Sequence, residues 1–264
     1  MKIALIGYGK MGKMVESAAL DRGHSITVVI DPFTPDTKSA SGAVLLRVFP
    51  ATAEAAGNPD LFMEFTNPKT APDNVKAAAA MGKPVVCGTT GWSEELQEVS
   101  AAVGKAGTTL LWSANFSLGV NLFYRIAGYA AALIDPFIEY DVGGTETHHR
   151  KKADSPSGTA KTLMEHILGA MNRKNKVLWA APSGETLGED TIHFASQRYG
   201  SVPGAHSLFF DSPADTIQIT HTVRTREGLA SGAVIAAEWL AGPEPEEIRS
   251  GIYTMEDVFK DMLP

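Results

Sequence analysis

The chain has 264 residues, of which 44% are hydrophobic and 20% are charged, and its formal net charge is -7. These values are typical of a globular protein with one large domain or two moderate ones. The negative charge argues against nonspecific binding to nucleic acid or to an anionic membrane, so we expect neither partner. The single cysteine, Cys87, excludes an internal disulfide and a cysteine-rich zinc site. Because one thiol suits a reducing compartment and the N-terminal apolar run is short, we expect a cytoplasmic protein.

The N-terminal residues predict a strand, a glycine turn and a helix, in that order. A short apolar run at residues 3–6 meets the turn at 7–12, and apolar residues then recur at helical spacing. A second strand, expected over residues 25–30, ends at Asp31, at the distance expected of a ribose-binding acid. A purely structural turn is the alternative. The combined pattern favours binding of a dinucleotide by Gly7, Tyr8, Gly9, Lys10, Met11, Gly12 and Asp31.

Asp31 also bears on the choice of nucleotide. Its carboxylate can accept hydrogen bonds from the ribose hydroxyls and repels a 2′-phosphate, and no arginine neighbours it in the sequence. Lys10 and Lys13 lie near the turn and can partly neutralise such a phosphate. We expect NADH to be preferred, with NADPH as the alternative.

The next residues alternate between strand and helix patterns. Strands are expected over residues 61–66, 84–87 and 108–112, and helices over 70–80 and 93–103. This alternation predicts a doubly wound parallel sheet. The strands lead into polar loops at one edge, where such sheets bind their ligands. These loops are residues 66–68, 88–91 and 113–116.

From about residue 119 the pattern is that of a mixed sheet. Helices are expected over residues 120–133 and 160–170, and strands over 137–143, 192–196, 206–210 and 216–222. Closing helices over 232–240 and 245–262 predict a return to the first domain. We therefore expect an α/β fold with a Rossmann-type doubly wound parallel sheet in residues 1–118 and 231–264. Residues 119–230 would form an α+β mixed-sheet domain for substrate binding and oligomerisation.

Residues 146–160 concentrate chemical groups in one segment. His148 is suited to proton donation near neutral pH, and Lys152 adds a second donor or an anion contact on the same face of an extended segment. The backbone N–H groups at 157–159 begin a helix and can point at a bound carboxylate. Ordinary loop histidines and a solvated charged face are the alternative. A metal site would need further ligands, so we expect none.

The motif Glu-x-His-His-x-x-Lys-x-Asp-x-Pro-Ser-Gly-Thr-Ala at 146–160 resembles the signature of the 4-hydroxy-tetrahydrodipicolinate reductases, also called dihydrodipicolinate reductases. The resemblance extends over nearly the whole chain, including the glycine turn, the loops at 65–68 and 88–91, and residues 114–121. It implies an enzyme of lysine and diaminopimelate biosynthesis in which NADH or NADPH reduces a cyclic unsaturated dicarboxylic acid with loss of water. It also implies a homotetramer built through the central domain.

The same resemblance implies roles for individual residues. His148 would be the proton donor and Lys152 a second proton donor, while His149, Gly158 and Thr159 would bind the substrate. The nicotinamide half of the cofactor would contact Gly88, Thr89, Thr90, Ser113, Ala114, Asn115 and Phe116.

The chain departs from the common family pattern in the loop at 197–206, where Val-Pro-Gly-Ala-His replaces Val-Gly-Glu-His, and at Asn67, where many members carry arginine. Two other functions stay open. Another Rossmann dehydrogenase of amino or keto acids would leave the Pro-Ser-Gly-Thr segment unaccounted for. A non-catalytic NADH-binding regulator would leave His148 and Lys152 unaccounted for.

Overall fold

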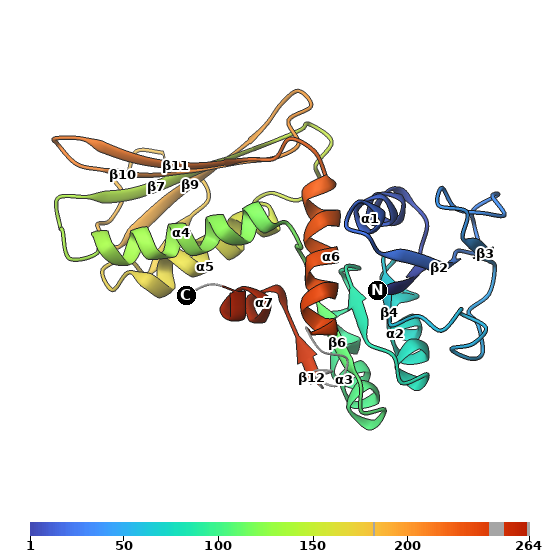
Figure 1. Cartoon of the computed structure of the whole chain (residues 1–264). Helices are drawn as coiled ribbons and strands as arrows, with labels where there is room; N and C mark the ends of the chain where they lie inside the picture. Colours follow the sequence, from blue (N-terminus) through green and yellow to red (C-terminus); the bar gives the residue numbers. More distant parts are fainter. Residues whose placement is uncertain (182, 243–250, 263–264) are drawn as a thin grey trace. The chain divides into compact units, whose positions relative to one another are not determined.

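The computed structural model describes residues 1–181, 183–242 and 251–262. The chain divides into two compact units, one formed by Met1–Leu118 with Glu227–Pro264 and the other by Gly119–Arg226 (Figure 1). The boundary expected after residue 230 lies instead before Glu227. The reason is that α6 (Glu227–Ala241) is one uninterrupted helix, which belongs to the first unit from its first residue.

Within the described residues, the first unit is built on a seven-stranded sheet in the order β12-β6-β5-β4-β1-β2-β3, with every neighbouring pair parallel. This arrangement confirms the expected parallel Rossmann-type sheet. The strands are β1 (Lys2–Ile6), β2 (Ser25–Ile30), β3 (Val44–Leu46), β4 (Leu61–Glu64), β5 (Val85–Cys87), β6 (Thr109–Trp112) and β12 (Gly251–Tyr253). Besides α6, the helices of this unit are α1 (Lys10–Asp21), α2 (Ala71–Ala80), α3 (Leu96–Lys105) and α7 (Met255–Met262), and a short 3₁₀ helix (Ser93–Glu95) precedes α3.

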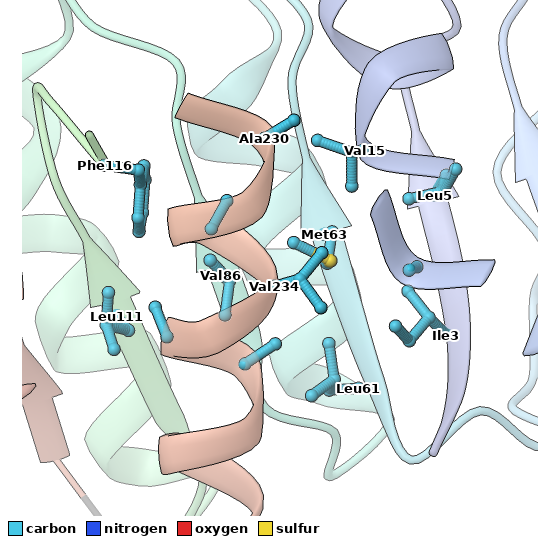
Figure 2. Close-up of a cluster of buried hydrophobic side chains, with 14 of the residues drawn as sticks. Ile3, Leu5, Val15, Leu61, Met63, Val86, Leu111, Phe116, Ala230 and Val234 are labelled. Atoms are coloured by element: carbon cyan, nitrogen blue, oxygen red, sulfur yellow. The ribbon is translucent and has the colours of Figure 1, made fainter. Parts of the chain in front are cut away.

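Apolar side chains cover both faces of this sheet, which explains why its strands are continuous apolar runs in the sequence. On one face, Leu5 and Met63 pack with residues of α1, α6 and α7 (Figure 2). On the other face, Ile6 and Phe62 pack with residues of α2 and α3. Each such buried side chain contributes roughly 1.5–3 kcal/mol of burial free energy. The two layers therefore hold the strand ends, and the loops that follow them, in place.

The strand order reverses at β1. From β1 the sheet continues through β2 and β3 to one edge and through β4, β5 and β6 toward the other. Connections after neighbouring strands diverge at such a reversal and leave a crevice outside the carboxyl ends of the strands. The glycine turn that follows β1 lies at this point.

The second unit contains a mixed sheet, which confirms the expected class. Among the described residues its order is β11-β10-β7-β9-β8, and β7 runs antiparallel to β10 but parallel to β9. The helices α4 (Leu118–Ile134) and α5 (Gly158–Ala170) lie side by side on one face of this sheet and share one apolar core with it (Figure 1). The strands are β7 (Asp141–His148), β8 (Lys176–Leu178), β9 (Thr191–Arg198), β10 (Ala205–Asp211) and β11 (Thr216–Thr222).

Strand β7 differs most from its prediction. It covers Asp141–His148 rather than residues 137–143, so it includes the first histidine of the motif. Its buried positions alternate regularly, but three of them are Gly144, Glu146 and His148. Because apolar alternation is the main signal of a half-buried strand, polar residues on the buried face hid its true extent.

Three short strands were not predicted at all, and a closing helix was predicted too long. β3, β8 and β12 have three residues each, too few to show a period. Of the helix expected over 245–262, residues 245–250 lie outside the described residues. Residues 251–253 form β12, which pairs with β6, and the helix itself is α7 (Met255–Met262).

In the described part of the chain, no helix combines the length and apolar character needed to cross a bilayer.

Candidate functional site

The turn after β1 is shaped by two glycines. Gly7 has φ +91°, and a Cβ there would lie 2.3 Å from the Phe65 carbonyl oxygen. A Cβ on Gly12 would lie 2.1 Å from the Gly7 carbonyl oxygen, so any side chain would push α1 away from the turn. Gly9, the N-cap of α1, has open space where a side chain would be and no side-chain cap. The first N–H groups of α1 therefore face an open space that suits a diphosphate.

The Asp31 carboxylate closes the other side of this turn. Its Oδ2 accepts a hydrogen bond from the Tyr8 N–H at 2.6 Å, and its Oδ1 accepts from the N–H groups of Phe33 at 2.7 Å and Thr34 at 3.1 Å. Each carboxylate oxygen has two lone pairs, so Oδ2, which has one donor, keeps acceptor capacity for a ribose hydroxyl. A cleft of about 320 Å³ opens beside it, lined by Gly7, Gly9, Asp31, Arg47, Phe65 and Asn67 among others.

Arg47 is a residue of this cleft that the sequence did not reveal. It follows β3, and its guanidinium donates to the carbonyl oxygens of Thr34 and, at 3.4 Å, of Asp36. In the sequence, no arginine stands directly after Asp31. Arg47 comes from the neighbouring strand instead, because β3 pairs with β2 in parallel and ends beside it. Only the pairing of β3 would have identified it.

The three polar loops expected at the carboxyl edge are joined by hydrogen bonds. The Thr66 N–H donates to Thr89 Oγ1 at 2.9 Å, and Trp112 Nε1 donates to the Thr89 carbonyl oxygen at 2.9 Å. The Ser113 N–H donates to the Cys87 carbonyl oxygen at 3.3 Å. The loops after β4, β5 and β6 therefore form one continuous edge, and Thr90, Ala114, Asn115 and Phe116 belong to the same loops. Cys87 itself is fully buried, and burial raises the pKa of its thiol, as expected of a structural residue.

Together, the uncapped turn, the acid and the loop edge fit a dinucleotide within the first unit. The α1 N-terminus would take the diphosphate, Asp31 the adenosine ribose, and the loops after β5 and β6 the nicotinamide half. Lys10 is exposed at the start of α1, and Met11 is half-buried behind it.

In the second unit, β7 ends at His148 and the chain turns at once. The Lys152 N–H donates to the His149 carbonyl oxygen at 3.0 Å, which closes a turn over residues 149–152. The expected extended segment, with His148 and Lys152 on one face, is therefore wrong. Lys152 instead lies in a turn, where its Nζ is 2.9 Å from Asp154 Oδ1. His148 is 7% exposed and His149 is half-buried.

The start of α5 was predicted well, with one correction. Ser157 is its N-cap, and the Ser157 side chain accepts a hydrogen bond from the Ala160 N–H at 3.1 Å. The Ser157 N–H, expected to be free for a ligand, donates to Glu146 Oε1 at 3.0 Å. Gly158 and Thr159 begin the helix, where N–H groups have no intrahelical acceptor.

Glu146 lies at the centre of this site and was not assigned a role from the sequence. It is fully buried. Besides the Ser157 N–H, its Oε1 accepts from Ser196 Oγ at 2.8 Å and from Arg198 Nη2 at 2.8 Å. Its Oε2 lies 3.4 Å from His148 Nδ1 and 3.4 Å from His206 Nε2. The position two residues before His148 on the same strand was the available signal, since such residues share a face.

The protonation states of Glu146 and His148 follow from their burial and from the polar groups around them. Burial alone would raise the pKa of Glu146, but the nearby His206 ring and hydrogen bonds from Ser157, Arg198 and Ser196 outweigh it and hold that pKa well below its ordinary value. Burial lowers the pKa of His148 to about 4, and nearby positive charge adds to the effect while Glu146 opposes it. At neutral pH the cluster therefore holds an ionised Glu146 and a neutral His148.

Ligand atoms of Glu146, His148 and His206 all lie within 4.8 Å of one another, a spacing that metal ions can use. The Arg198 guanidinium already pairs with this carboxylate. A metal cation beside Glu146 would be repelled by the charges of Arg198 and Lys152. The same two charges lower the pKa of His148. We therefore interpret the cluster as a hydrogen-bonded proton site rather than as a metal centre.

Comparison with known proteins agrees with this organisation. Residues 1–116 match the family profile described as dihydrodipicolinate reductase, N-terminus, and residues 119–259 match dihydrodipicolinate reductase, C-terminus. The chain is 36% identical to a 4-hydroxy-tetrahydrodipicolinate reductase of Christiangramia forsetii, over 100% of this chain and 99% of the relative. It is also 36% identical to one of Methanoculleus marisnigri, over 94% of this chain and 99% of the relative.

Solved structures show the same fold. A dihydrodipicolinate reductase of Paenisporosarcina sp. TG-14, solved with dipicolinate, superimposes with a TM-score of 0.76 at 20% identity, covering 98% of this chain and 99% of the other. A probable dehydrogenase of Thermotoga maritima gives a TM-score of 0.59 at 12% identity, covering 89% and 85%. Both halves of the chain match profiles of one family, and two full-length relatives carry its activity in their names. The chain therefore belongs to the dihydrodipicolinate reductase family.

Proposed function

We propose that the protein reduces 4-hydroxy-tetrahydrodipicolinate to tetrahydrodipicolinate, with oxidation of NADH or NADPH and loss of one water. The observation that carries this proposal is His148 at the end of β7, set on a buried carboxylate and followed directly by a helix start that can bind an anion. A cyclic dicarboxylic substrate needs both features, because it must be protonated as it is reduced and must be held by its carboxylates.

The reduced nicotinamide, when bound, supplies a hydride. The chain's own residues bind the two carboxylates and manage the proton that balances the hydride. His148 and Lys152 would donate protons to the negative charge that develops on the conjugated imine. His149 and the N–H groups of Gly158 and Thr159 would hold a substrate carboxylate at the N-terminus of α5.

Cofactor binding is assigned to the first unit. The turn residues Gly7–Gly12 with Asp31 would hold the adenosine and diphosphate half. The loop edge would hold the nicotinamide half through Gly88, Thr89, Thr90, Ser113, Ala114, Asn115 and Phe116. The hydrogen bonds from Thr66 to Thr89 and from Ser113 to Cys87 support this assignment, because they hold the loops in one arrangement before the cofactor arrives.

NADH is proposed to be preferred, with NADPH accepted through Arg47. In the Asp31→Asn variant, the dissociation constant for NADH should rise about tenfold relative to that for NADPH, because the substitution removes a charged acceptor and the repulsion of a 2′-phosphate. The Arg47→Ala variant should change the ratio in the opposite direction. Fluorescence titration with each nucleotide measures both. Asp36→Asn, an exposed carboxylate outside the cleft lining, is the matched control. An unchanged ratio in both variants would contradict these roles.

The function is tested by oxidation of NADH, and separately of NADPH, with substrate made freshly by a coupled dihydrodipicolinate synthase from pyruvate and aspartate semialdehyde. Rapid oxidation is expected only with this substrate. Oxidation of the nucleotide with a keto acid, alone or together with ammonia, would instead favour the other dehydrogenase. NADH binding without oxidation of any substrate would favour a regulator.

A homotetramer in the cytoplasm is proposed as well. Leu122, Ile126, Tyr129 and Leu133 recur on one face of α4 with exposed fractions of 37–69%, and such an apolar stripe is typical of a contact between subunits. Light scattering after gel filtration should give four times the 28.1 kDa chain mass. Ile126→Glu should lower that mass because it buries a charge in the contact. A monomeric parent protein would contradict the proposal.

A further inference from the structure

The two oxygens of Glu146 have different surroundings. Oε1 is engaged by the Ser157 N–H, by Ser196 and by Arg198, all at 2.8–3.0 Å. Among the described residues, Oε2 accepts no hydrogen bond and lies 3.4 Å from two ring nitrogens, His148 Nδ1 on its own strand and His206 Nε2 on β10. One oxygen therefore anchors the carboxylate, and the other faces the rings of both His148 and His206.

This arrangement constrains where the His148 proton sits. An ionised carboxylate can only accept hydrogen bonds, so a ring nitrogen beside it is stable as N–H and unstable with a bare lone pair. A neutral imidazole carries one N–H. With Nδ1 beside Glu146 Oε2, that proton belongs on Nδ1, and Nε2 keeps a lone pair.

We propose that Glu146 is a positioning residue that keeps the proton of His148 on Nδ1 and thereby makes Nε2 the atom that exchanges a proton with the substrate. The catalytic half of this inference rests on the proposed function, whereas the location of the proton does not. Nε2 lies on the side of Gly204, where a Cβ would come within 3.1 Å of it, so a side chain at position 204 would crowd the nitrogen.

The proton balance is simple. A proton from solvent binds Nε2 and gives an imidazolium, which then transfers this proton to the substrate and returns to the neutral Nδ1–H form. Arg198 on β9, Lys152 in the following turn and His206 on β10 all oppose this charge. Glu146 favours it, and so do the two carboxylates of an arriving substrate. His148 would thus be charged mainly when substrate is bound.

The unmodified protein provides the first test. Long-range ¹H–¹⁵N correlation spectra distinguish the two neutral tautomers of histidine, and a His148→Asn variant assigns the resonance. Near pH 7, without substrate, His148 should show the Nδ1–H pattern. A predominant Nε2–H pattern would overturn the inference, whatever the protein catalyses.

The Glu146→Gln variant provides the second test. The amide oxygen should take the place of Oε1, where three donors need an acceptor, and the NH₂ group should then face both histidines. This would move the His148 proton to Nε2. We expect kcat to fall about 10²- to 10⁴-fold, the range that a general acid contributes, with the dissociation constant for NADH unchanged. The tautomer signal should switch at the same time.

Ser196→Ala is the matched control, because it removes one hydrogen bond from the same carboxylate but leaves Oε2 in place. It should keep the Nδ1–H pattern and most of the activity. If both variants lose activity equally and keep the Nδ1–H pattern, Glu146 has only a structural role and the inference is wrong. If the parent protein is no reductase, the tautomer measurements still decide the position of the proton.

Discussion

Turnover is expected to fall about 10³-fold in His148→Ala and in Lys152→Ala, and further in the double variant, while NADH binding is retained. Each substitution removes a proposed proton donor from the second unit, and general acids contribute about 10²–10⁴-fold to rate. The residues that are assigned to NADH belong to the first unit, which neither substitution touches. Steady-state kinetics with NADH titration measures the two effects separately.

Two exposed or half-buried residues of the same unit provide controls. His193→Ala and Lys176→Ala remove the same residue types from β9 and β8, and both should keep kcat within about twofold, as surface changes usually do. Unimpaired turnover in both His148→Ala and Lys152→Ala would contradict the assignment of the proton donors.

The low His148 pKa has a measurable consequence of its own. Because this pKa is about 4 in the free protein, the imidazole is almost uncharged near about pH 5.5. A bound dianion favours the charged imidazolium and raises the pKa of His148. Binding of dipicolinate (pyridine-2,6-dicarboxylate) should therefore take up protons at that pH. Calorimetry in two buffers of different ionisation enthalpy detects this uptake. It should disappear in His148→Ala.

Gly12→Val is expected to abolish useful binding of either nucleotide, with dissociation constants at least about 10²-fold higher, or roughly 2.7 kcal/mol. A Cβ at this position would lie 2.1 Å from the Gly7 carbonyl oxygen, which is backbone and cannot rotate away. The N-terminus of α1 must therefore shift, and its N–H groups would no longer meet the diphosphate. Overpacking should also lower the free energy of unfolding by about 1–3 kcal/mol.

The control for this variant is Gly104→Ala in α3, where the added Cβ meets no atom within 4 Å. It should bind both nucleotides normally and be slightly more stable, because alanine favours a helix over glycine. Thermal unfolding shows whether Gly12→Val still folds. Normal nucleotide binding by folded Gly12→Val would contradict the role given to the turn.

The parallel sheet could be predicted closely because its strands are buried on both faces. Ser25–Ile30 has the expected bounds, and residues 61–64, 85–87 and 109–112 lie within the expected strands. Apolar runs between helical patterns mark such strands directly. β7 shows the opposite case, since its buried face carries Glu146 and His148. At these two positions polar residues stand where apolar residues would have indicated a strand.

The site was predictable only as far as its sequence motifs extend. The motif predicted a helix start at Ser157, and α5 begins there, whereas the extended segment expected after His148 is a turn. The partners of Glu146 come from three strands and a helix start that are up to 60 residues away, and no local pattern joins them. Arg47 was missed for the same reason. Strand pairing, rather than spacing, brings these residues together.

The most direct test of the account is the fate of deuterium placed at the transferable C4 position of the reduced nucleotide. With freshly made 4-hydroxy-tetrahydrodipicolinate, the protein should yield tetrahydrodipicolinate that carries one deuterium, at a rate equal to nucleotide oxidation. Unlabelled product, or no product from a folded protein shown to bind NADH, would contradict the proposed reduction.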